Sequence, residues 1–93
     1  MFNATSRPKL APKVKRRIDP ITQRTVLLVP EKGLVLNGTA AAIAALCDGE
    51  HTYEAIVAEI CETHPHADRE RIEVEVADFL QGLVDRCLLM VQS

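Results

Sequence analysis

The sequence predicts an α+β fold of the winged-helix type, in which an N-terminal three-stranded antiparallel sheet precedes a bundle of three helices. Two patterns carry this prediction. Up to residue 36, short aliphatic runs are separated by Pro and Gly, as in strands joined by turns. From residue 38 onward, apolar residues recur at i, i+3, i+4 and i+7, as on one face of a helix. A length of 93 residues allows one small domain.

We expect residues 1–12 to be a flexible N-terminal arm, because they contain Pro8 and Pro12 and little apolar periodicity. Residues 13–93 are then a single domain. No apolar run approaches the ~20 residues that span a bilayer. The N-terminus also lacks the apolar region of a signal peptide. We therefore expect a cytoplasmic protein that does not contact a membrane.

Three strands are expected at about 14–18, 25–29 and 34–36. The first alternates, with Val14 and Ile18 on one face. The second is apolar at consecutive positions, which predicts that both of its faces are covered. In a meander the second strand is central, and the other two are the edges.

The two edges differ in charge. The first strand carries basic residues, a common guard against edge-to-edge pairing: Lys13, Lys15, Arg16 and Arg17. The strand at 34–36 carries no charge. It is either covered by a helix, paired in a dimer, or left open for a partner.

The first helix is expected over 38–47, capped by Asn37 or Thr39, with Gly49 as its C′ residue. Its predicted buried side chains are Ile43, Leu46 and Cys47.

The second and third helices are expected over 53–64 and 69–86, capped by Thr52 and Asp68. Their apolar stripes define the predicted core. The second stripe is Tyr53, Ile56, Val57, Ile60 and Cys61, and the third is Ile72, Val76, Phe79, Leu80, Leu83 and Val84. Residues 88–91 read as a short terminal strand or a tail that packs on the bundle.

The cysteines and histidines do not predict a metal site or an active site. Cys61 falls on an apolar stripe, and Pro65 interrupts the helix between His64 and His66. No Cys or Ser lies beside a plausible base, and no Gly-rich phosphate loop is present. We expect no enzyme activity, no metal and no cofactor.

The charge distribution argues against DNA as the partner of this winged helix. Residues 1–32 carry eight Lys/Arg and two Asp/Glu, whereas residues 33–93 carry three Lys/Arg and eleven Asp/Glu. The third helix, which would enter the major groove, is acidic on its outer face, and phosphates would repel it.

Peptide binding by strand addition fits the pattern better. A groove between the third strand and the third helix would offer Leu34, Val35 and Leu36 on one wall. The other wall would be Ala77, Leu80 and Val84, for which an ordinary core position is the alternative.

Several segments in order resemble the PqqD family of pyrroloquinoline quinone (PQQ) biosynthesis, over nearly the whole chain. They are Arg7-Pro8-Lys9-Leu10-Ala11-Pro12, Val26-Leu27-Leu28-Val29-Pro30-Glu31, Leu34-Val35-Leu36-Asn37, Leu46-Cys47-Asp48-Gly49, and Phe79-Leu80 with Leu83. Cys87 departs from the family, which usually has Gly before the final Leu-Leu, and this puts the closing turn in question.

The resemblance implies a non-catalytic recognition element for ribosomally made, modified peptides. It would bind the precursor peptide PqqA beside the third strand and the third helix. It would then present PqqA to the radical S-adenosylmethionine (SAM) enzyme PqqE, which crosslinks a Glu and a Tyr of that peptide. The implied peptide-binding residues are Leu34, Val35, Leu36, Asn37, Ala77, Leu80 and Val84.

The alternative is a non-catalytic homodimeric scaffold that uses the same edge strand. A monomer and a homodimer with swapped N-terminal segments are both compatible with the sequence.

Overall fold

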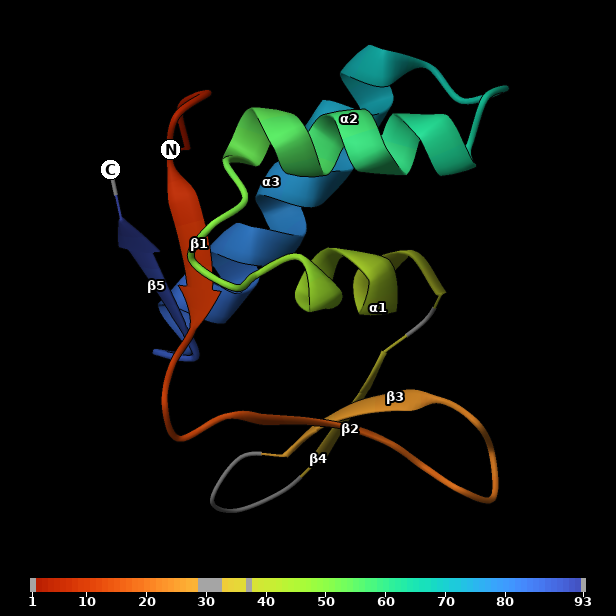
Figure 1. The fold of residues 1–93 in the computed structure, drawn as a ribbon, viewed down its shortest axis with the longest axis vertical. Coiled ribbons are helices and arrows are strands. Elements are labelled where there is room, and N and C mark those ends of the chain that lie inside the picture. The colour runs from red at the N-terminus through yellow and green to blue at the C-terminus, as the bar shows by residue number, and fades with distance from the viewer. Residues whose placement is uncertain (1, 29–32, 37, 93) are drawn as a thin grey trace.

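The computed structural model describes residues 2–28, 33–36 and 38–92 and contains two small sheets and three helices (Figure 1). One sheet has the antiparallel order β2-β3-β4, and the other pairs β1 with β5. The predicted fold class is confirmed. In chain order the elements are β1 (Arg7–Leu10), β2 (Lys15–Ile18), β3 (Thr25–Leu28), β4 (Gly33–Leu36), α1 (Gly38–Ala45), α2 (Tyr53–Thr63), α3 (Arg69–Asp85) and β5 (Leu89–Gln92).

The three-stranded sheet has one covered face and one open face. Leu27 and Leu36 are buried on the face that we call the inner face, turned toward the helices. Val26, Leu28 and Val35 alternate with them and lie on the opposite, outer face. All helices lie on one side of this sheet in Figure 1. The expectation that both faces of the second strand are covered was therefore wrong, because no described element packs on the outer face.

Strand β2 is exposed along its whole length. Val14 is buried, but it lies just before the strand, and Ile18 at its end is 56% exposed. The two residues expected on one face therefore do not share one environment.

Helices α2 and α3 begin where their capping residues predict. The Thr52 hydroxyl accepts a hydrogen bond from the Ala55 N–H at 3.1 Å, and the Asp68 carboxylate accepts one from the Glu70 N–H at 3.3 Å. Their predicted apolar stripes form a large part of the core. The buried members of the stripes are Ile56, Val57, Ile60, Ile72, Val76, Leu80 and Leu83.

Helix α1 ends at Ala45, two residues earlier than predicted, in a tighter turn with backbone bonds between residues three apart. Gly49 is consequently not its C′ residue. With φ of +81°, Gly49 turns the chain against β1, where a Cβ atom would lie 3.0 Å from the Cδ of Lys9. Of the two predicted caps, Thr39 lies inside α1 and Asn37 lies outside the described residues.

The expectation that residues 1–12 form a flexible arm was wrong. Residues Arg7–Leu10 form β1, which pairs with β5, and Pro8 is fully buried. The Ser6 carbonyl oxygen also accepts a hydrogen bond from the Tyr53 N–H at 2.7 Å. Local sequence could not show this, because the partner strand lies near the other end of the chain. The predicted terminal strand is confirmed as β5. Among the described helices, none is long and apolar enough to cross a membrane.

Candidate functional site

Strand β4 forms one edge of the three-stranded sheet. Its residues pair with β3 in a regular antiparallel register, with Val35 opposite Val26 and Leu36 opposite Thr25. Among the described strands, none pairs with its other side. Val35 is 61% exposed at this edge. An extended peptide could therefore add a strand here through backbone hydrogen bonds.

A groove of about 230 Å³ lies between β4 and α3. Val35 and Leu36 form its β4 wall. Residues one helical turn apart form the α3 wall, so that one face of the helix is presented to the strand. These helical residues are Asp78, Phe79, Gly82, Leu83 and Arg86.

Gly82 keeps the groove open. A Cβ atom at this position would have no other atom within 4 Å, so the space in front of the helix is empty. Glycine inside a helix costs about 1 kcal/mol relative to alanine, so nothing in the stability of α3 favours it. A larger side chain at this position would project into the groove.

A second hollow of about 470 Å³ continues the groove along α3 toward α1. Asp78 and Phe79 line both hollows. From Glu75 to Arg86 the combined groove follows about 16 Å of helix, the length of about five extended residues. The α1 side of the second hollow is Thr39, Ala40 and Ile43.

The floor of the groove is apolar, and its ends carry opposite charge. Leu83 is buried and Phe79 is half-buried against the core. Glu75 and Asp78 lie at the α1 end, and Arg86 lies at the other end. Arg71 approaches Glu75 at 3.4 Å, but both side chains are largely exposed and the pair is weak.

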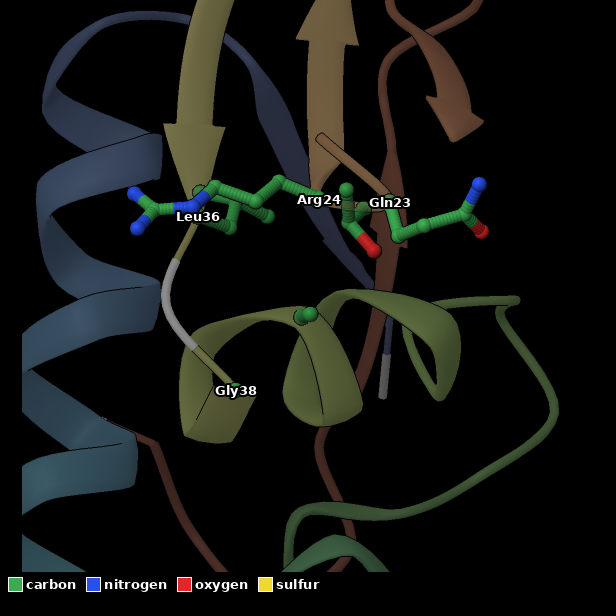
Figure 2. Close-up of a pocket in the computed structure, with 6 residues that line it drawn as sticks. Gln23, Arg24, Leu36 and Gly38 are labelled. Carbon is green, nitrogen blue, oxygen red and sulfur yellow. The ribbon is translucent and has the colours of Figure 1, made fainter. Parts of the chain in front are cut away.

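A third hollow of about 390 Å³ lies at the end of the sheet above α1 (Figure 2). Gln23 and Arg24 point in opposite directions at its rim, and Gly38 lies in the first turn of α1. Leu36 lines this hollow as well as the groove. Leu36 therefore packs at the junction of the sheet, α1 and the groove.

The structure places the predicted site residues unequally. Val35 and Leu36 line the groove, whereas for Leu34 the structure gives only its backbone pairing with Leu27. Asn37 lies outside the described residues.

The α3 residues that line the groove are offset by about one position from the predicted ones. Leu80 is fully buried in the core, and Ala77 and Val84 are half-buried without lining the groove. The groove instead uses the neighbouring face. Phe79 and Leu83 were visible as stripe residues, and Gly82 was visible as a lone glycine in a helix.

The cysteine, histidine and acidic side chains of the described residues do not gather into a metal site. No group of three metal-ligating side chains occurs among them. The ring Nδ1 of His64 lies 3.1 Å from the Ile60 carbonyl oxygen, within its own helix end. Desolvation raises the pKa of the buried Cys47 thiol to about 12, which makes it unreactive.

Comparisons with known proteins agree with this geometry. The family profile of coenzyme PQQ synthesis protein D (PqqD) matches residues 24–89. The chain is 39% identical over 84 residues to a PqqA binding protein of Rhodopseudomonas palustris (strain BisB5). That match covers 90% of this chain and 81% of the relative.

Two solved structures share the fold. The first is the solution NMR structure of the PqqD truncation of Methylobacterium extorquens PqqCD, described as a stand-alone recognition element for ribosomally synthesized and post-translationally modified peptides. It is 31% identical, with a TM-score of 0.79 over 97% of this chain and 95% of that one. The second, TbiB1 in complex with the TbiA(beta) leader peptide, is 28% identical. Its TM-score is 0.74 over 87% of this chain and 93% of that one. The profile match over residues 24–89, the 39% identical relative and the shared fold together show that the chain belongs to the PqqD family.

Proposed function

We propose that this protein binds the precursor peptide PqqA as an added strand beside β4 and presents it to the radical SAM enzyme PqqE. The observation that carries the proposal is the side of β4 with which no described strand pairs, next to an apolar groove. Relatives named PqqA binding protein support the identity of the guest. The structural similarity to TbiB1, solved with a leader peptide, supports a peptide as the kind of guest.

The backbone of β4 would supply affinity, and the groove would supply specificity. Alternate side chains of an added strand point to opposite faces, so every second guest residue would turn toward α3. There it would meet Phe79, Gly82 and Leu83. Leu34 and Asn37 remain predicted contacts through their backbone. Ala77, Leu80 and Val84 would act indirectly, by supporting the helix.

In this proposal the protein has no catalytic role and works in the cytoplasm. Radical chemistry needs an iron–sulfur cluster held by thiolates. Cys61 lies in α2, whereas Cys47 and Cys87 lie in the connections after α1 and α3, and Cys47 is buried. The chemistry would therefore belong to PqqE.

Filling the groove tests the docking site. We expect Gly82→Leu to weaken PqqA binding at least about tenfold, because the added side chain occupies the space meant for the guest. Leucine also favours the helix, so the thermal midpoint should not fall. The measurement is a titration of labelled protein with synthetic PqqA, followed by amide chemical shifts and by calorimetry.

Gln81→Leu is the matched control, since it adds the same side chain to the neighbouring, exposed position of α3. Its affinity for PqqA should stay within about twofold of the wild type. An equal loss of PqqA affinity in both variants would contradict the proposed site. So would chemical-shift changes on PqqA binding that lie outside residues 33–36 and α3.

The same β4 edge also allows the alternative of a homodimeric scaffold. Sedimentation with and without PqqA separates the two functions. A tight dimer that is indifferent to the peptide would favour the scaffold.

A further inference from the structure

The outer face of the three-stranded sheet carries basic and apolar side chains on different strands. Strand register places Arg17, Val26 and Val35 in one row across the sheet, and Lys15 and Leu28 in the next. Residues in one row share a face. The outer face is thus basic along β2 and apolar along β3 and β4.

This apolar area is accessible. Leu28 is 36% exposed and Val35 is 61% exposed. No described element lies on this side of the sheet in Figure 1. A shallow hollow of about 260 Å³ completes the face at the β2–β3 turn, where Pro20 and Asp19 join Arg17, Val26 and Leu28. Contiguous apolar surface bordered by charge is typical of a protein-interaction site.

We propose that the outer face docks a folded protein whose contact surface presents carboxylates around apolar side chains, and that this protein acts on the bound peptide. The proposal rests on strand addition beside β4. A guest strand there has one side toward the α3 groove, so its other side extends the outer face. A partner on the outer face would then contact the recognition element and the peptide together.

The chemistry of the face favours a protein over nucleic acid. Phosphate backbones need positive charge over an extended surface, but on this face the charge is confined to Lys15 and Arg17 of β2, and β3 and β4 beside it are apolar. The acidic α3 lies on the same small molecule and opposes phosphate further. The carboxylates of such a protein surface would pair with Lys15 and Arg17, and its apolar side chains would cover Val26, Leu28 and Val35.

Neighbouring arginines on β2 provide the test. Arg16 and Arg17 are adjacent and exposed, yet Arg16 pairs with Leu27 and so belongs to the inner face. We expect Arg17→Glu and Lys15→Glu to weaken binding of the purified enzyme PqqE, loaded with PqqA, at least about tenfold. Arg16→Glu makes the same charge change on the opposite face and should stay within about twofold. Wild-type binding should also weaken as salt increases.

PqqA titrations of the same variants separate this inference from the proposed function. If the wild-type protein does not bind PqqA, the proposed function is contradicted, and the inference is contradicted with it. The inference alone fails if the wild type binds both PqqA and PqqE but all three variants bind PqqE alike. A wild type that binds PqqA but not PqqE would contradict both the presentation to PqqE and the inference. It also fails if the outer face proves to pair with a second copy in sedimentation, or to bind duplex DNA.

Discussion

At the scale of single residues, the end of α3 explains how Cys87 replaces the glycine expected there. The Leu88 N–H donates to the Leu83 carbonyl at 2.8 Å, and the Cys87 N–H donates to the Val84 carbonyl at 2.9 Å. These two bonds form a Schellman motif, which places Cys87 at C′ with φ of +61°. The closing turn that the sequence put in question is therefore kept, but with a non-glycine residue in the left-handed region.

We expect Cys87→Gly to stabilise the protein by about 1 kcal/mol, because glycine adopts this φ without the clash of a Cβ atom. Urea denaturation measures the change. Arg86→Gly is the control, since Arg86 has an ordinary φ of −94° and glycine there only adds unfolded-state entropy. A lower urea midpoint for Cys87→Gly would contradict the argument.

Asp48 is the residue whose charge state should affect stability at low pH. Desolvation raises the pKa of its carboxyl, but hydrogen bonds from the Glu50 N–H, the His51 ring and the His51 N–H outweigh it and lower the pKa from 3.8 to about 2. A lowered folded-state pKa gives stability that is present above pH 3.8 and lost as the pH falls toward 2.

The urea midpoint of the wild type should therefore exceed that of Asp48→Asn at pH 7, and the difference should shrink between about pH 4 and pH 2. Because Asp48 is substantially exposed, we expect a modest difference. A difference that is constant with pH would show that the carboxylate charge has no such role.

At the scale of elements, the N-terminal segment closes the start of α2. The Tyr53 and Glu54 N–H groups have no partner within the helix, and they donate to the carbonyls of Ser6 and Ala4. The ring of Phe2 stacks on Tyr53 with centroids 6.1 Å apart. Residues 2–6 thus act as a cap for a helix that begins almost fifty residues later.

Deleting residues 2–6 should lower the free energy of unfolding by about 2 kcal/mol, since two backbone hydrogen bonds and an aromatic contact are lost. Hydrogen exchange should show the loss first at the amides of Tyr53 and Glu54. Thr5→Ala, a change at an exposed position in the same segment, is the control. Unchanged exchange after the deletion would mean that the segment is a flexible arm after all.

Prediction from sequence succeeded for elements whose signals are local. The caps and stripes of α2 and α3 lie within a few residues of one another, so their bounds agree with the structure to one residue. Strand β1 was not predicted, because the residues that pair with it lie far away in the sequence, in β5. A groove does lie between β4 and α3, but the residues of α3 that line it differ from the predicted Ala77, Leu80 and Val84. A stripe identifies the buried side of a helix, whereas the face turned toward β4 depends on how the helix packs.

At the scale of the whole molecule, the boundary between the basic and the acidic parts coincides with the proposed binding groove. Eight of the eleven Lys and Arg residues lie in residues 1–32, the part of the chain that supplies β1, β2 and β3, and most of the carboxylates lie on the helices. The groove lies between these two parts, with Asp78 and Arg86 among its lining residues. A peptide bound there would contact both parts, which is a reason for a small domain to keep its charges separated.

The pairing of β1 with β5 also has a consequence for how the protein is made. Arg7 lies opposite Gln92, so the first strand finds its partner only after β5 has left the ribosome. The β2–β3–β4 meander and the α2–α3 pair use near neighbours and can form earlier during synthesis. A nascent chain would therefore carry a formed β4 edge before the domain is closed, and an early guest or a second unfinished chain could reach that edge first.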